Sequence, residues 1–179
     1  MKNIYIEILY EKLKNILSDN FIGVLIESCA LRLTLQNHDS PVDFKPFKDN
    51  RNLLIEPLKL NWLTEITPSL AASYRDENRI TDYAAMCVAL ILSTELIDFD
   101  FVEMAEKGDG VDCWFRQKGA IDFVARLEIS GIRQANEVNS IHNRLKIKLK
   151  QTNQSDASNV PAYVSIIEFS QPEILYLLK

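Results

Sequence analysis

The sequence has little of the chemistry that builds zinc sites or disulfide frameworks. It contains two histidines, which lie far apart and have no cysteine or carboxylate at ligand spacing. A zinc site is therefore not expected. The cysteines are three in number, widely spaced and without a CxxC pair, and they are Cys29, Cys87 and Cys113. This pattern predicts buried free thiols in a reducing compartment.

Long hydrophobic runs are also missing. The longest apolar run, Ala84–Leu92, is far shorter than the roughly 20 residues that cross a bilayer. The first residues carry Glu7 and Glu11, which is unlike a signal peptide. The expectation is a soluble cytoplasmic protein that does not associate with a membrane.

The chain has no excess of basic residues. Its formal net charge is −5, and an acidic chain is a poor general binder of polyanions. Any binding to DNA is therefore expected to be weak and to depend on local basic clusters. With 179 residues, 47% of them hydrophobic and 25% charged, the composition is typical of a single globular domain.

The first 76 residues form an N-terminal extension of mixed character. Residues 4–17 place apolar side chains on one helical face, and residues 18–20 are expected to end that helix. Leu31, Leu33 and Leu35 alternate with polar residues, which predicts an extended segment over residues 21–36. A turn follows at residues 37–41, and prolines divide residues 41–78 into short strands or helical turns.

Residues 77–170 show a clearer order of elements. Apolar spacing predicts a helix over residues 79–95 and another over 133–150. Between them the sequence predicts three strands over residues 97–102, 111–116 and 121–131, the last two joined by a hairpin loop at residues 117–119. A polar loop and a last strand over residues 162–169 follow. The predicted class is α/β, with a mixed central sheet flanked by helices.

Two carboxylates are expected to meet on this sheet. Alternation places Asp112 and Trp114 on one face of their strand, and Arg126, Glu128 and Ser130 on one face of the next. Paired strands lie about 5 Å apart, so coinciding polar faces bring Asp112 and Glu128 together. Such a pair suits a hard divalent cation such as Mg²⁺, which can activate water for phosphodiester hydrolysis.

The element order and these motifs resemble the PD-(D/E)XK nuclease superfamily over residues 77–169. The motif reads Gly110-Val111-Asp112, then fifteen residues, then Glu128-Ile129-Ser130. The resemblance implies a restriction-endonuclease-like αβββαβ core and a divalent-metal-dependent DNA endonuclease. It implies that Asp112 and Glu128 bind Mg²⁺ or Mn²⁺, together with an acidic residue of the preceding helix, either Asp82 or Glu77.

The sequence departs from the family at one position. The family lysine two residues after the glutamate is Ser130 here, which can orient a water but carries no charge. Arg126 or Arg133 could supply the positive charge instead. We therefore expect weak activity that is greater with Mn²⁺ than with Mg²⁺. The departure equally suits a catalytically degenerate relative that acts in binding, immunity or regulation.

Structural roles compete with these assignments. Asp112 could be an ordinary residue at the start of a strand, and Glu128 could pair with Arg126 or Arg133. A third reading is a structural subunit that docks through its N-terminal helix, and a homodimer or a protein partner stays open. Finally, a basic run ends the 133–150 helix. It is either a solvated face or a contact to the phosphate backbone through Lys146, Lys148 and Lys150.

Overall fold

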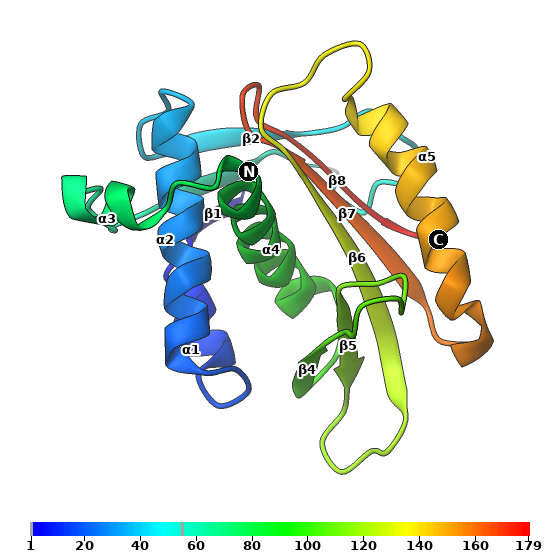
Figure 1. The fold of residues 1–179 in the computed structure, drawn as a ribbon. Coiled ribbons are helices and arrows are strands. Elements are labelled where there is room, and N and C mark those ends of the chain that lie inside the picture. Colours follow the sequence, from blue (N-terminus) through cyan, green and yellow to red (C-terminus); the bar gives the residue numbers. More distant parts are fainter. Residues whose placement is uncertain (1, 55) are drawn as a thin grey trace.

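A computed structural model describes residues 2–54 and 56–179. One mixed eight-stranded sheet, in the order β1-β3-β2-β8-β7-β6-β5-β4, forms the centre of the molecule. Helices α1, α2 and α4 cover one face, and α5 covers the other (Figure 1). The α/β class and the mixed sheet between helices, both predicted from the sequence, are confirmed.

The N-terminal region contributes three strands to this sheet. Its elements are β1 (Lys2–Tyr5), α1 (Ile8–Leu13), α2 (Asp19–Leu35), β2 (Val42–Pro46), β3 (Leu58–Asn61) and α3 (Pro68–Ser73). The prediction of one helix over residues 4–17 is wrong, because residues 2–5 pair with β3 as a parallel strand. A partner more than fifty residues away overrides the local helical pattern.

The prediction of an extended segment over residues 21–36 is also wrong. These residues form most of α2, in which Leu31 and Leu33 are both buried. They lie on different sides of a helix that is surrounded by the core, so apolar residues two apart imitate a strand. Ser18, which was expected to end a helix, instead caps the start of α2 by accepting a hydrogen bond from the Phe21 N–H.

The elements from residue 77 onward follow the predicted order. They are α4 (Glu77–Leu96), β4 (Phe101–Met104), β5 (Cys113–Arg116), β6 (Phe123–Ile132), α5 (Ile141–Gln151) and β7 (Ala162–Glu168). The three sequential antiparallel strands are confirmed, and β7 runs parallel to β6. The helix expected over residues 133–150 begins later, at Ile141, after its cap Ser140. Asn136 holds the preceding loop by accepting hydrogen bonds from two backbone N–H groups.

Two further elements complete the chain. A 3₁₀ helix, η1 (Thr152–Ser158), occupies the predicted polar loop, and β8 (Glu173–Leu178) was not foreseen. Strand β8 pairs with β7 and also with β2, and so it joins the two halves of the sheet.

Strand β6 runs through the interior of the molecule. The apolar cluster of α1, α2 and α4 covers one of its faces, and the smaller cluster of α5 covers the other. Residues Ala125–Ser130 are buried without interruption, so the polar residues among them have little access to water. All three cysteines are buried free thiols, as predicted. Within the described residues, no helix is both long and apolar enough to span a bilayer.

Candidate active site

Asp112 is fixed at the start of β5 by the backbone of β6. Its N–H donates to the Leu127 carbonyl at 2.8 Å, and its Oδ2 accepts from the Ile129 N–H at 2.7 Å. Gly110 allows the preceding turn, because it has a φ of +72° and a Cβ there would lie 2.4 Å from the Gln151 carbonyl oxygen. The Gly-Val-Asp motif therefore positions one carboxylate firmly against β6.

Glu128 lies beside Asp112 and is completely buried on the face of β6 that α5 covers. One carboxylate oxygen, Oε1, accepts a hydrogen bond from Nζ of Lys148 on α5. The other, Oε2, is buried and has no hydrogen-bond partner in the described residues. A buried carboxylate oxygen without a partner is costly. A proton that Glu128 shares with Asp112, or a bound cation, would remove that cost.

The electrostatics of the site reflect this crowding. Burial, followed by the negative charge of Asp112, raises the pKa of Glu128 to about 7, although Lys148 opposes the shift. Burial also raises the pKa of Asp112, against the hydrogen bond from Ile129. The two carboxyl groups therefore resist carrying two negative charges at once, as expected for a pair that a cation would complete.

Asp82 of α4 faces the same place. Together with Met86, Asp112, Ile129, Gly131 and Lys148 it lines a cavity of about 110 Å³. Burial and the charge of Asp112 raise the pKa of Asp82. Gly131 permits this approach, since a Cβ at that position would lie 2.5 Å from the Thr81 carbonyl oxygen of α4. Asp112 thus has an acidic neighbour on each of two elements, Asp82 of α4 and Glu128 of β6.

The alternative acidic residue of α4, Glu77, points elsewhere. It lies five positions before Asp82 on the helix, so the two side chains face different directions. Glu77 accepts a hydrogen bond at 2.6 Å from Arg32, a buried residue of α2, and lies 3.7 Å from Arg133. Of the two alternatives, the structure places Asp82 beside Asp112 and places Glu77 between the two arginines.

Neither arginine proposed to replace the family lysine reaches the carboxylates. Arg126 is buried, and it donates to Asp156 at 2.5 Å and to Ser158 at 3.1 Å, both in η1. Arg133 lies beyond the end of β6, near Glu77. The expected ion pair of Glu128 with either arginine is also wrong, because these side chains leave the strand toward η1 and α4.

Lys148 provides the positive charge at this site. It had been grouped with Lys146 and Lys150 as a surface patch, but residues two apart lie on nearly opposite sides of a helix. Its side chain is only 16% exposed, whereas Lys146 and Lys150 are exposed. The signal was present in the sequence, since Lys148 follows Ile141 and Leu145 at helical spacing along the buried stripe of α5.

Ser130 lies on the same face of β6 as Glu128 and is buried. Within the described residues, its hydroxyl forms no hydrogen bond with Glu128 or Lys148. Its role in orienting a water stays a prediction.

The carboxylates fit a hard divalent cation by their chemistry, since all the candidate ligands are oxygens. Across residues 2–54 and 56–179, however, no three His, Cys, Asp or Glu side chains are already arranged to hold a metal ion. A cation at this site would need Lys148 to release Glu128 and Asp82 to move closer.

No protein-family model, curated protein or solved structure matches this chain.

Proposed function

We propose that the protein is a divalent-metal-dependent endonuclease of the PD-(D/E)XK type, which hydrolyses phosphodiester bonds in DNA. One observation carries the proposal: Lys148 of α5 lies against Glu128 and beside Asp112, and so returns the positive charge that Ser130 lacks. The order α4-β4-β5-β6-α5-β7, with β6 and β7 parallel, supports a restriction-endonuclease-like core.

Asp112, Glu128 and Asp82 would hold Mg²⁺ or Mn²⁺. The unpartnered Oε2 of Glu128 and the raised pKa of each carboxyl group support this assignment. When bound, the cation would lower the pKa of a water and neutralise charge on the phosphate. Binding would also release the proton that Glu128 retains near neutral pH.

Lys148 would then change partners. Its ammonium group would turn from Glu128 toward the phosphate and stabilise the negative charge that develops as water attacks phosphorus. The new P–O bond forms from the water oxygen, which gives up one proton to solvent. The bond to the leaving alcohol oxygen breaks, and that oxygen takes up one proton from solvent, so atoms and charge balance. Ser130 could orient the water by a hydrogen bond.

The test is cleavage of plasmid DNA by the purified protein with Mg²⁺ or Mn²⁺. We expect weak cleavage, stronger with Mn²⁺, and its loss in Asp112→Asn and Glu128→Gln. Lys148→Gln should lower the rate by about 100-fold or more, as for the loss of one group that stabilises charge in the transition state. Lys146→Gln is the matched control, because it removes an equal charge from the exposed side of the same helix. Undiminished cleavage by Asp112→Asn and Glu128→Gln would rule out this site.

A non-catalytic binding, immunity or regulatory protein of the same fold is the second candidate. The ion pair between Lys148 and Glu128 favours it, because it satisfies both charges without a metal. Absence of cleavage by the parent protein, together with no Mn²⁺ binding in calorimetry, would select this candidate.

A further inference from the structure

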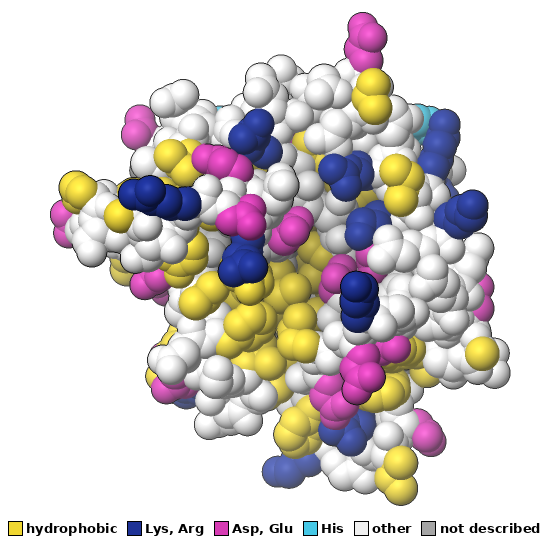
Figure 2. Space-filling view, viewed as in Figure 1, with side chains coloured by type: hydrophobic (Ala, Val, Ile, Leu, Met, Phe, Trp, Pro, Cys, Tyr) yellow, Lys and Arg dark blue, Asp and Glu magenta, His cyan; other side chains and the backbone are white. Residues whose placement is uncertain are grey.

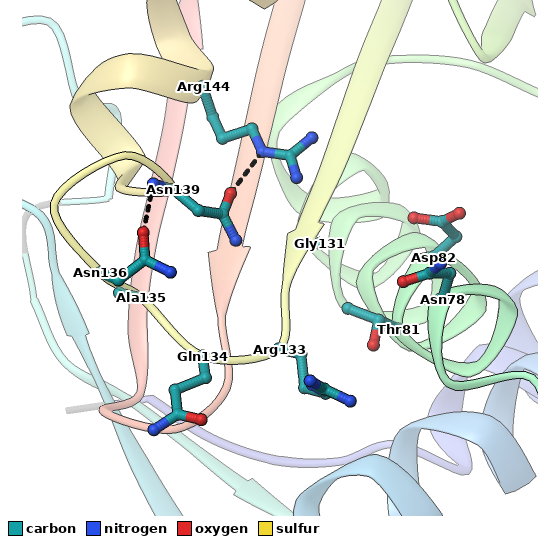
Figure 3. A pocket seen from close by; sticks show the side chains of 10 residues that line it. All are labelled: Asn78, Thr81, Asp82, Gly131, Arg133, Gln134, Ala135, Asn136, Asn139 and Arg144. Carbon is teal, nitrogen blue, oxygen red and sulfur yellow. Dashed lines mark hydrogen bonds between the residues drawn. The ribbon is translucent and has the colours of Figure 1, made fainter.

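A polar cleft of about 680 Å³ lies next to the candidate site. It is bounded by the start of α4, the end of β6, the loop of residues 133–140 and the first turns of α5 (Figure 3). Amide, hydroxyl and guanidinium groups dominate its walls. The side chains that could bind a ligand are those of Asn78, Gln134, Asn136, Asn139, Arg133 and Arg144.

The cleft continues into the candidate site and beyond it. Asp82 and Gly131 line both the cleft and the 110 Å³ cavity at the carboxylates. Asp112 lines that cavity and also a third depression, of about 370 Å³, with Lys107, Gln151 and others. The three depressions therefore lie next to one another, with Asp82 and Asp112 at their shared borders. An extended polymer fits such a shape better than a compact small molecule.

The chemistry of the cleft suits phosphate. Arg144 and Arg133 enter it from α5 and from the end of β6 (Figure 3). The Nε of Arg144 donates to Asn139 at 2.7 Å, which holds the guanidinium plane while the described contacts leave its terminal nitrogens without a hydrogen bond. Guanidinium groups bind phosphate through paired hydrogen bonds, and neutral amides add donors without repulsion.

The two walls of this cleft differ in charge, because acidic residues gather at the start of α4 whereas Arg144 enters from α5. On the face drawn in Figure 2, Lys and Arg side chains predominate over the α5 side near its start. The acidic residue of the cleft itself is Asp82, at its border with the candidate site.

We propose that this cleft binds backbone phosphates of a nucleic-acid strand. These phosphates flank, on one side, the phosphate that would be cleaved at the carboxylates. Arg133 and Arg144 are the principal contacts. The inference rests on the proposed function for the identity of the polymer, and it assigns binding to the cleft in place of the exposed Lys146 and Lys150.

The experiment measures binding without catalysis. Fluorescence anisotropy in EDTA would follow a labelled 20-nucleotide single strand and the corresponding duplex as probes. The double variant Arg133→Gln/Arg144→Gln is compared with Lys146→Gln/Lys150→Gln, which changes the net charge by the same amount. We expect the cleft variant to bind the preferred probe about 100-fold more weakly. For a duplex, the slope of log K against the logarithm of salt concentration should become shallower by about 1.8 in the cleft variant. The slope of the control variant should change little.

Equal weakening in the two double variants, unchanged binding by the cleft variant, or no binding of either probe by the parent protein would each overturn the proposal. If the double variant is misfolded, Arg133→Gln alone gives the test, since the Arg133 side chain is 55% exposed. Loss of binding by the cleft variant with no cleavage by the parent protein would refute only the endonuclease. Cleavage by the parent protein with normal binding by the cleft variant would refute only the cleft.

Discussion

Replacing Glu128 with glutamine should change how stability depends on pH. The folded protein raises the pKa of Glu128 from an ordinary value near 4.5 to about 7, chiefly by burial. The folded state therefore holds this proton more tightly than the unfolded chain does. The resulting stabilisation is fully present below the unfolded pKa and is lost as the pH rises through about 7.

The size of the effect follows from the shift. One pKa unit corresponds to about 1.4 kcal/mol, so the parent protein should lose about 2–3 kcal/mol between pH 5 and pH 8 through Glu128. Glutamine does not titrate, so the free energy of unfolding of Glu128→Gln should not fall in this way. Relative to the parent protein, the variant should become more stable by the same amount between pH 5 and pH 8. In a chain of this length the gap in Tm should widen by about 5–10 °C. Lys148, partly exposed, can turn toward solvent when its partner loses its charge.

Thermal denaturation at pH 5, 6, 7 and 8 would measure the difference in Tm between Glu128→Gln and the parent protein. Glu103→Gln is the matched control, because the Glu103 side chain is 45% exposed and pairs with Arg116 at the surface. It gives the effect on Tm of removing a carboxylate from an exposed ion pair, against which the effect of Glu128→Gln is compared at each pH. A constant gap for Glu128→Gln would mean that Glu128 titrates near its ordinary pKa, and the electrostatic description of the site would be refuted.

Two further predictions concern metal binding and packing. Mn²⁺ should raise Tm by several degrees at pH 8 but much less at pH 5, because the proton must leave Glu128 before the ion binds. A Tm increase of the same size in the Asp112→Asn variant would contradict this prediction. Gly131→Ala should destabilise the protein by about 1–3 kcal/mol in urea denaturation, because its Cβ would strike the α4 backbone at Thr81. Gly23→Ala, with nothing within 4 Å of the added Cβ, should not destabilise it and serves as the control.

The sequence was most informative where local pattern and tertiary environment agree. The α4 helix and strands β5 and β6 were predicted correctly, since their apolar spacing matches the faces that they bury. The strand predicted over residues 97–102 is displaced: β4 begins at Phe101 and buries Val102, while Phe101 is exposed. Asp112 and Glu128 were expected to meet, because a hairpin pairs residues that are close in sequence. Such local contacts need no knowledge of distant segments.

Contacts between segments that are distant in the chain could not be predicted from the sequence. Arg32 of α2 binds Glu77 of α4, and Lys148 of α5 binds Glu128 of β6, so the partner of each acidic residue depended on helix packing. Strand β1 was read as part of a helix because its partner, β3, lies far along the chain. The buried stripe of α5 indicates that Lys148 faces inward, but no local pattern specifies which residue of another element it meets.

The placement of β8 bears on how the chain folds. Residues 42–46 of β2 find one of their two neighbours only in residues 173–178, which also pair with β7. During synthesis the N-terminal strands must therefore wait for most of the chain before their sheet edge is closed. Contacts of such long sequence separation slow folding and leave strand edges unpaired in the interval. A nascent chain of this protein would thus expose β2 to intermolecular pairing until β8 arrives.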